Sequence, residues 1–307
     1  MRDRGKQGVA LVHPRLYRRF MTEFRTYSIT ASRLSLNIVE WGDPQAPPLV
    51  LVHGGRDHAR AWDEVARAFA PRWRVIVPDL RGHGDSEWVN DGIYQIHDHL
   101  QDLITLSRKL DLPPCPYIGH SLGGNVVTRF AGLYPDRVSR LVNIEGLGEP
   151  PALAAERAKR DQVVVLRDWL EKRIRLAEFE PRPHADADAL GDRMAALDAH
   201  IPRAKVMELL RLGTRANPDG SVTLKYDPAI SPAPPDLPQD VKHRLWAAIT
   251  CPILLIYGAQ SWASNPAVDG RAQLFRNARV ELIEGAGHWL HHDQPEIFIA
   301  LVTDFLA

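Results

Sequence analysis

A serine between glycines is the strongest chemical signal in this sequence. The segment YIGHSLGG places Ser121 in a G-x-S-x-G pattern between an apolar run and an amphipathic segment. A serine in a sharp strand-to-helix turn needs neighbours without a Cβ, and the following helix offers free N–H groups to developing negative charge. The pattern therefore predicts that Ser121 is a nucleophile, with a purely structural turn as the alternative reading.

The elements that must position this serine follow from the hydrophobic periodicity. Short, uniformly apolar runs alternate with longer amphipathic segments, which predicts right-handed βαβ units. We expect an α/β fold whose mainly parallel, twisted sheet carries helices on both faces. The expected strands are 34–41, 48–53, 73–79, 116–120, 138–145, 251–258 and 278–285, and the expected helices are 59–70, 96–110, 122–134, 266–276 and 294–306.

One long segment interrupts this alternation late in the sheet. Residues 150–213 are rich in Ala, Arg and Glu at helical spacing, and a Pro-rich stretch follows at 227–238. We therefore predict a helical cap inserted at 147–245, which divides the core into 24–146 and 246–307. A basic arm, residues 1–23, precedes the core.

Composition limits the classes of function. The chain has 307 residues, 45% hydrophobic and 25% charged, and its 38 Lys and Arg balance 38 Asp and Glu. A balanced charge gives no overall attraction to nucleic acid, and no apolar run is long enough to span a membrane. The two cysteines, Cys115 and Cys251, indicate buried thiols in a reducing cytoplasm. We expect a small-molecule substrate, and the sequence carries no signal that indicates an oligomeric state.

Three further segments carry a resemblance to a known family. These segments are similar to parts of the α/β-hydrolase superfamily, in the same order along the chain. LVHGGRDHARAWDEVA (51–66) resembles its His-Gly loop, VPDLRGHGDSEW (77–88) its Asp-x-Arg-Gly-His-Gly-x-Ser loop, and IEGAGHWLHHDQPEIF (283–298) its late Gly-His segment. The resemblance runs from about Phe24 to the C-terminus. It indicates the fold specifically but says little about the substrate.

The resemblance implies roles for individual residues. Ser121 would be the nucleophile and His288 the general base that takes its proton. The oxyanion hole would use the N–H groups of Leu122 and Gly55. His53 and His83 lie in loops that this family uses structurally, so we expect no chemical role for them.

The acid that should orient His288 is not at its usual place. In many members of the superfamily it stands three residues after the glycine of the strand that reads ILLIYG here, and that position is Ser261. A serine cannot supply the charge that stabilises an imidazolium. We favour Glu145, at the end of the preceding strand. Asp269 is a distant alternative because it should lie in the next helix, and Glu145 could instead merely cap the entry to the insertion.

The nucleophile limits the reaction. Relatives that open epoxides or displace halide use a carboxylate as the nucleophile. This chain has Ser121 at that position, so these two activities are disfavoured. We therefore expect a serine hydrolase that cleaves an ester, lactone or thioester of a small, mostly apolar substrate through an acyl-enzyme, without a cofactor. The alternatives are a C–C bond hydrolase, a proline-type aminopeptidase and a non-catalytic ligand-binding protein of the same fold.

The histidines and tryptophans near the expected active face could also have purely structural roles. The HDH (97–99) and HWLHH (288–292) segments lack an obvious carboxylate-plus-histidine frame, so we expect no metal. The candidates for substrate binding are Trp62, Trp262, Trp289 and His120, although packing is the more common role of a single tryptophan in such a position.

Overall fold

The structure is a computed structural model that describes residues 23–177, 181–196, 200–230 and 236–307. The basic arm expected at 1–23 lies outside the described residues except for its last position. In these ranges no helix combines the length and apolar character needed to cross a bilayer.

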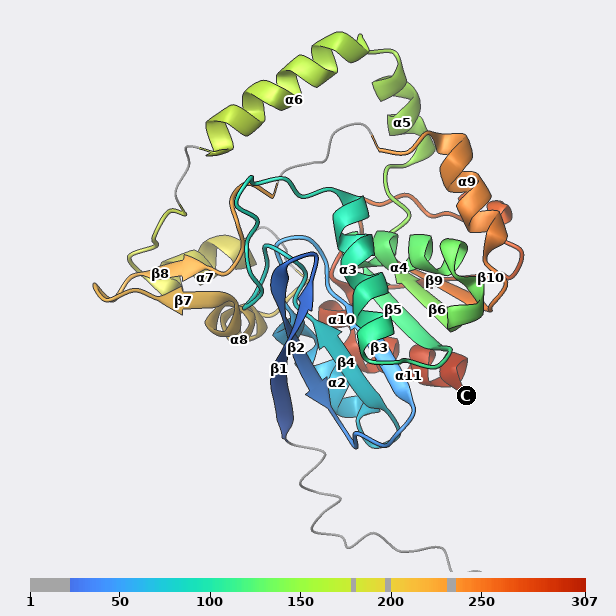
Figure 1. The fold of residues 1–307 in the computed structure, drawn as a ribbon, viewed down its shortest axis with the longest axis horizontal. Helices are drawn as coiled ribbons and strands as arrows, with labels where there is room; N and C mark the ends of the chain where they lie inside the picture. Colours follow the sequence, from blue (N-terminus) through green and yellow to red (C-terminus); the bar gives the residue numbers. More distant parts are fainter. Residues whose placement is uncertain (1–22, 178–180, 197–199, 231–235) are drawn as a thin grey trace, which may run out of the picture.

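A single eight-stranded sheet forms the centre of the molecule, in the order β1-β2-β4-β3-β5-β6-β9-β10 (Figure 1). β1 pairs antiparallel with β2, and β2 pairs antiparallel with β4, whereas every later pairing is parallel. The strands are β1 Phe24–Ala31, β2 Leu34–Trp41, β3 Pro48–Val52, β4 Arg74–Pro78, β5 Cys115–His120, β6 Val138–Ile144, β9 Ile253–Gly258 and β10 Ala278–Ile283.

Helices cover both faces of the sheet because its central strands are apolar on both sides. In β3, Leu49 and Leu51 join one hydrophobic core while Val50 and Val52 join the other. The first core is closed by α2 Asp63–Phe69 and α11 Pro295–Leu306, and the second by α3 Ile96–Lys109, α4 Leu122–Leu133 and α9 Gln239–Ala248. The predicted mainly parallel α/β fold is confirmed.

The helix predicted at 266–276 is wrong. Only a short 3-10 turn, η3 Arg271–Leu274, forms there. Gly270, just before it, has a φ of 87°, a left-handed conformation that ends regular helical geometry. Asp269 therefore lies in a loop and not in a helix. Two further 3-10 turns are η1 Ala59–Trp62 and η2 Pro135–Arg137.

The segment between β6 and β9 adds elements outside the sheet. α5 and α6 form an arch that stands off from the body of the molecule, whereas α8 lies against it (Figure 1). Nε2 of His58 lies 3.2 Å from the carbonyl oxygen of Leu209, and Lys205 pairs with Glu64 at 2.8 Å. The elements are α5 Pro151–Ala158, α6 Gln162–Ala177, α7 Ala187–Ala195, α8 Arg203–Gly213, β7 Thr214–Ala216 and β8 Val222–Leu224.

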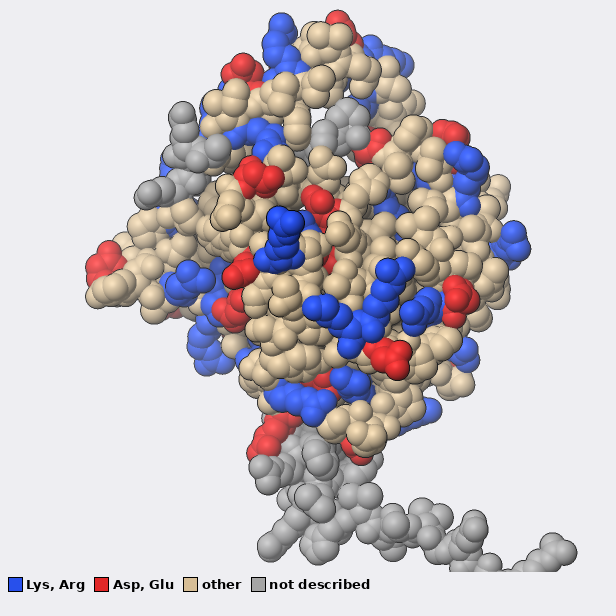
Figure 2. Space-filling view, viewed as in Figure 1, with Lys and Arg blue, Asp and Glu red and all other residues tan. Residues whose placement is uncertain are grey.

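Acidic and basic side chains are interspersed over the face seen in Figure 2. Neither sign dominates one side of that face, in line with the equal totals of 38 basic and 38 acidic residues in the chain. This face therefore presents no single-sign surface of the kind that binds nucleic acid through its phosphates.

Candidate active site

Ser121 occupies the strained turn between β5 and α4. Its φ is 51° and its ψ is −112°, a backbone conformation that non-glycine residues rarely adopt and that costs on the order of 1–3 kcal/mol. The turn is also tight, because a Cβ on Gly119 would lie 2.5 Å from the carbonyl oxygen of Gly123. The N–H of Ser121 donates to the carbonyl of Ile144 in β6 at 2.8 Å, which holds the turn against the neighbouring strand.

Glu145 and His288 form a direct pair beside this turn. Nδ1 of His288 donates to Oε2 of Glu145 at 2.5 Å, and both side chains are buried. Because Nδ1 carries the proton, Nε2 of His288 is left with a lone pair that can accept one. Within the described part of the chain the hydroxyl of Ser121 makes no hydrogen bond.

Glu145 is held by more than the histidine. It follows β6 directly, and its φ of 48° is a second left-handed, non-glycine conformation at the site. The N–H of Gly258 donates to Oε1 at 2.8 Å, so both carboxylate oxygens accept hydrogen bonds. These contacts fix the carboxylate at the carboxyl ends of β6 and β9.

Ser261 contacts the same carboxylate. Its Oγ donates to Oε2 of Glu145 at 2.6 Å, the oxygen that also accepts from His288. From the sequence, Ser261 was notable only because it stands where many relatives have the acid, and no role in the site was predicted for it. The position itself was the signal, since a side chain three residues after Gly258 reaches the same edge of the sheet.

Asp269 is engaged elsewhere. It forms an ion pair with Arg271 at 2.7 Å and accepts from the hydroxyl of Ser264. Burial alone would raise the pKa of Asp269, but the hydrogen bonds from Arg271 and Ser264 hold it below its ordinary value. Of the two carboxylates considered, Glu145 contacts His288 and Asp269 does not.

The two expected oxyanion donors lie near each other. Gly55 is exposed in the loop after β3, and Leu122 opens α4. A Cβ on Gly55 would be 3.9 Å from the Cβ of Leu122, and one on the preceding Gly54 would be 3.4 Å from the Cβ of Ser121. The loop after β3 thus packs directly against the serine turn and the N-terminus of α4.

Of the four candidates for substrate binding, two are removed from solvent. Trp62 is fully buried and stacks on His291 with ring centroids 4.6 Å apart. His120 is also buried, and its Nε2 donates to the carbonyl oxygen of His288 at 2.9 Å, which supports the loop that carries His288. Trp262 and Trp289 differ: their rings lie 5.0 and 5.2 Å from that of His288, and Trp262 is 69% exposed.

Other buried histidines support the loops. Nε2 of His53 accepts the N–H of Leu80 at 2.9 Å, and Nδ1 of His83 lies 2.9 Å from the carbonyl of Arg81. Burial lowers the pKa of both His53 and His83 to about 3, so both are neutral near pH 7. These contacts agree with the structural roles expected for these two residues.

Comparison with known proteins agrees with this geometry. A family model described as the alpha/beta hydrolase fold matches residues 47–295. The chain belongs to this family. Mouse sn-1-specific diacylglycerol lipase ABHD11 is 29% identical to this alpha/beta hydrolase over 284 residues, which cover 89% of this chain and 85% of the relative.

Two further comparisons extend the picture. The 3-hydroxybutyrate-oligomer hydrolase of Cupriavidus necator is 30% identical over 233 residues, covering 72% of this alpha/beta hydrolase and 75% of the relative. Among solved structures, the thioesterase domain from the curacin biosynthetic pathway superposes with a TM-score of 0.79 at 22% identity, covering 92% of this chain and 100% of that domain. At that identity the likeness concerns the fold.

Proposed function

We propose that this protein is a serine hydrolase that cleaves a carboxylic ester, lactone or thioester through an acyl-enzyme. One observation carries the proposal: Nδ1 of His288 donates to the buried Glu145 at 2.5 Å, and the ring of His288 lies 4.7 Å from that of His120, the residue directly before the serine in the strained turn. A histidine held in this tautomer is the base that a serine nucleophile needs.

In the proposed first step, Oγ of Ser121 attacks the substrate carbonyl carbon while Nε2 of His288 takes its proton. The negative charge that develops on the carbonyl oxygen is stabilised by the N–H groups of Leu122 and Gly55. Removing one such donor in other enzymes costs about 3–4 kcal/mol of transition-state stabilisation. His288 then returns the proton to the leaving alcohol or thiol, and the acyl group stays on Ser121.

In the second step water attacks the acyl carbon and loses a proton to Nε2 of His288. As the bond to Ser121 breaks, His288 returns that proton to Oγ of Ser121, and the carboxylic acid is released. Glu145 stabilises the imidazolium form of His288 in both steps. Because Glu145 also accepts from Ser261 and Gly258, its carboxylate cannot rotate away from Nδ1 without breaking other hydrogen bonds. Ser261 is thus proposed as a positioning residue.

The substrate is proposed to be small and mostly apolar. Trp262 and Trp289 flank the ring of His288 and offer two aromatic surfaces next to the reacting atoms. The part of residues 147–245 that precedes α9 is proposed as the cap that limits what can reach these surfaces, because α9 itself packs on the core. Two relatives are named as a diacylglycerol lipase and a hydroxybutyrate-oligomer hydrolase, which favours cleavage of an acyl bond by water.

Hydrolysis of a short-chain p-nitrophenyl ester tests the proposal, with the Ser121→Ala variant as the control. We expect the wild-type protein to turn over the ester and the variant to lose nearly all of that activity. Hydrolysis that survives unchanged in folded Ser121→Ala protein, or no hydrolysis of esters, lactones or thioesters by the wild type, would contradict it.

A further inference from the structure

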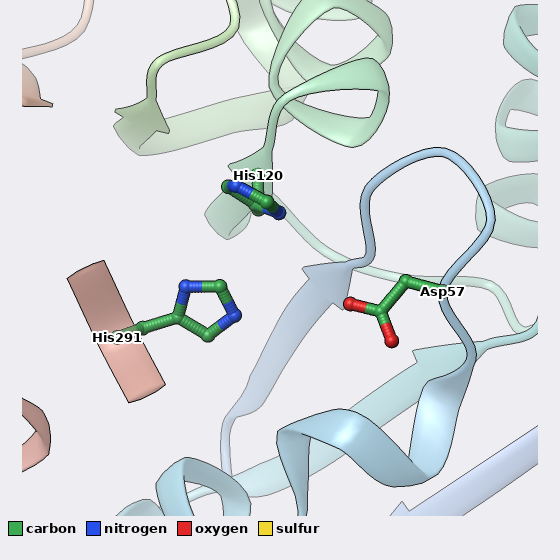
Figure 3. Close-up of side chains that lie close together, drawn as sticks. All are labelled: Asp57, His120 and His291. Carbon is green, nitrogen blue, oxygen red and sulfur yellow. The ribbon is translucent and has the colours of Figure 1, made fainter. Parts of the chain in front are cut away.

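Three buried or partly buried side chains from distant parts of the sequence converge next to the serine turn. Asp57 lies in the loop after β3, His120 ends β5, and His291 belongs to α10 Leu290–Asp293. A carboxylate oxygen of Asp57 and one ring nitrogen of each histidine all lie within 4.8 Å of one another. Figure 3 shows the three side chains pointing toward a common centre.

The tautomer of His120 is set by its hydrogen bond to the loop that carries His288. Nε2 faces the carbonyl oxygen of His288 at 2.9 Å, and a carbonyl can only accept, so Nε2 must carry the proton. Nδ1 then has a bare lone pair. Among the described residues nothing donates a hydrogen bond to Nδ1 of His120, although this atom is fully buried. A buried acceptor without a partner is costly, which indicates that something else meets it.

His291 has the same deficit. It is 1% exposed, and neither ring nitrogen finds a hydrogen-bond partner in the described part of the chain. Its ring is held in place by stacking on Trp62, with the two planes 21° apart. An imidazole that is positioned this firmly and yet has no polar contact is prepared for a ligand.

We propose that Asp57, His120 and His291 bind a single divalent transition metal ion of the Zn²⁺ class. The ion would be held by a carboxylate oxygen of Asp57, Nδ1 of His120 and one ring nitrogen of His291, with a fourth position left for water. Two imidazoles and one carboxylate are a typical donor set for zinc, whereas Mg²⁺ and Ca²⁺ prefer oxygen donors alone.

The surroundings of the ligands fit this assignment. Histidines that bind metals usually donate their other ring N–H to a carbonyl or carboxylate, as Nε2 of His120 does. The carboxylate of Asp57 is held by the N–H of His58 at 2.8 Å. Space beside His120 is kept by a glycine, because a Cβ on Gly54 would lie 2.7 Å from Nδ1.

The three ligand atoms must move closer together to bind an ion. Zinc–ligand bonds of about 2.0–2.1 Å in a tetrahedron place ligand atoms roughly 3.3 Å apart, so the cluster must close by up to about 1.5 Å along its longest edge. Rotation of the Asp57 carboxylate and small shifts of the imidazole rings are the movements available. An ion here would tie the loop that carries Gly55 to the end of β5, independently of whether Ser121 acts as proposed.

Metal binding can be measured without any activity. Chelator-treated protein is titrated with Co²⁺, whose visible absorption reports coordination in a closed site, and the ion is then displaced with Zn²⁺. We expect one saturable equivalent per chain and a higher melting temperature with Zn²⁺. Wild-type protein that gains no visible band and no thermal shift would overturn the proposal.

Three variants locate the ion. Asp57→Asn and His291→Gln should each weaken Co²⁺ binding by more than the roughly 10–100-fold typical of losing a supporting residue. His292→Gln is the matched control, because His292 is the next residue, is also buried and is not part of the cluster. Equal affinity in all three variants, or loss in His292→Gln alone, would overturn the assignment.

Discussion

Glu145 is the residue on which the proposed chemistry depends most. It holds a left-handed backbone conformation, is buried, and accepts hydrogen bonds from three groups, one of them His288. Glu145→Gln preserves volume but removes the charge and replaces one of the two acceptor oxygens with an NH2 donor, so the Nδ1–H tautomer of His288 is no longer enforced. We expect kcat to fall by up to about 10⁴-fold, the scale seen when an analogous acid becomes its amide.

Steady-state kinetics on a p-nitrophenyl ester measure this effect. Asp269→Asn is the control, because Asp269 pairs with Arg271 and not with His288. In folded protein its kcat should stay close to that of the wild type. Full activity in Glu145→Gln would refute the role proposed for Glu145.

Ser261 should act on catalysis through Glu145, although its Oγ also accepts the N–H of Ala263 at 3.2 Å. Ser261→Ala removes one hydrogen bond to a carboxylate, an interaction worth about 1.5–3 kcal/mol, so we expect kcat to fall roughly 10- to 100-fold with little change in KM. Ser264→Ala, in the same loop but bonded to Asp269, is the control. In addition, Ser261→Asp should restore part of the rate lost in Glu145→Gln. A Glu145→Gln/Ser261→Asp double variant that folds normally but is inactive would contradict the claim that residues 145 and 261 reach His288 from the same edge of the sheet.

At the scale of elements, the sequence predicted what periodicity can encode. The buried strands and the helices α3, α4 and α11 appear near their expected bounds, because apolar runs and amphipathic repeats determine them directly. β7 and β8 were missed since strands of three residues are too short to show a period. β1 was missed because it is a largely exposed edge strand of mixed polarity.

The residues of the candidate sites also divide into those that the sequence could predict and those that it could not. Ser121 and His288 stand in local motifs, and Glu145 could be inferred because strand ends of a parallel sheet meet at one edge. The cluster of Asp57, His120 and His291 could not be inferred, because its members come from three segments and no short spacing links them. Which histidine nitrogen lacks a partner depends on tertiary contacts alone.

One ion pair links α4 to the segment just before α9. Arg129 in α4 is almost fully buried and donates to Asp236 at 2.5 Å, whose carboxylate is 34% exposed. Asp236→Asn leaves the guanidinium without its counter-charge, so we expect the free energy of unfolding to fall by about 2 kcal/mol, less than for a fully buried pair. Urea unfolding measures this loss. Asp240→Asn, in an exposed pair with Arg244, should be nearly silent, and equal effects of both substitutions would contradict the prediction.

At the scale of the whole molecule, buried histidines should make the protein sensitive to acid. Burial lowers the pKa of His53, His83 and His292 to about 3, and it lowers the pKa of His99, His120 and His291 well below the ordinary value. The unfolded chain takes up protons as the pH falls below about 6.5, whereas the folded chain does not until a much lower pH. Stability is therefore retained above about pH 6.5 and lost below it.

Each such histidine contributes a slope of about 1.4 kcal/mol per pH unit in that window. We expect the urea midpoint to fall steeply between about pH 6.5 and pH 5, before most carboxylates begin to titrate. A midpoint that stays constant over this range would contradict the burial of these residues as neutral groups.

The most direct test of the central claim is covalent labelling of the intact protein with a fluorophosphonate, followed by mass spectrometry of the whole chain and of its peptides. Such a reagent reacts with a serine only where a neighbouring base has activated it. The structure predicts one adduct per chain, located on Ser121, and much slower labelling in Glu145→Gln. No adduct on a folded protein that hydrolyses esters, or an adduct on another residue, would contradict the account of Ser121, His288 and Glu145.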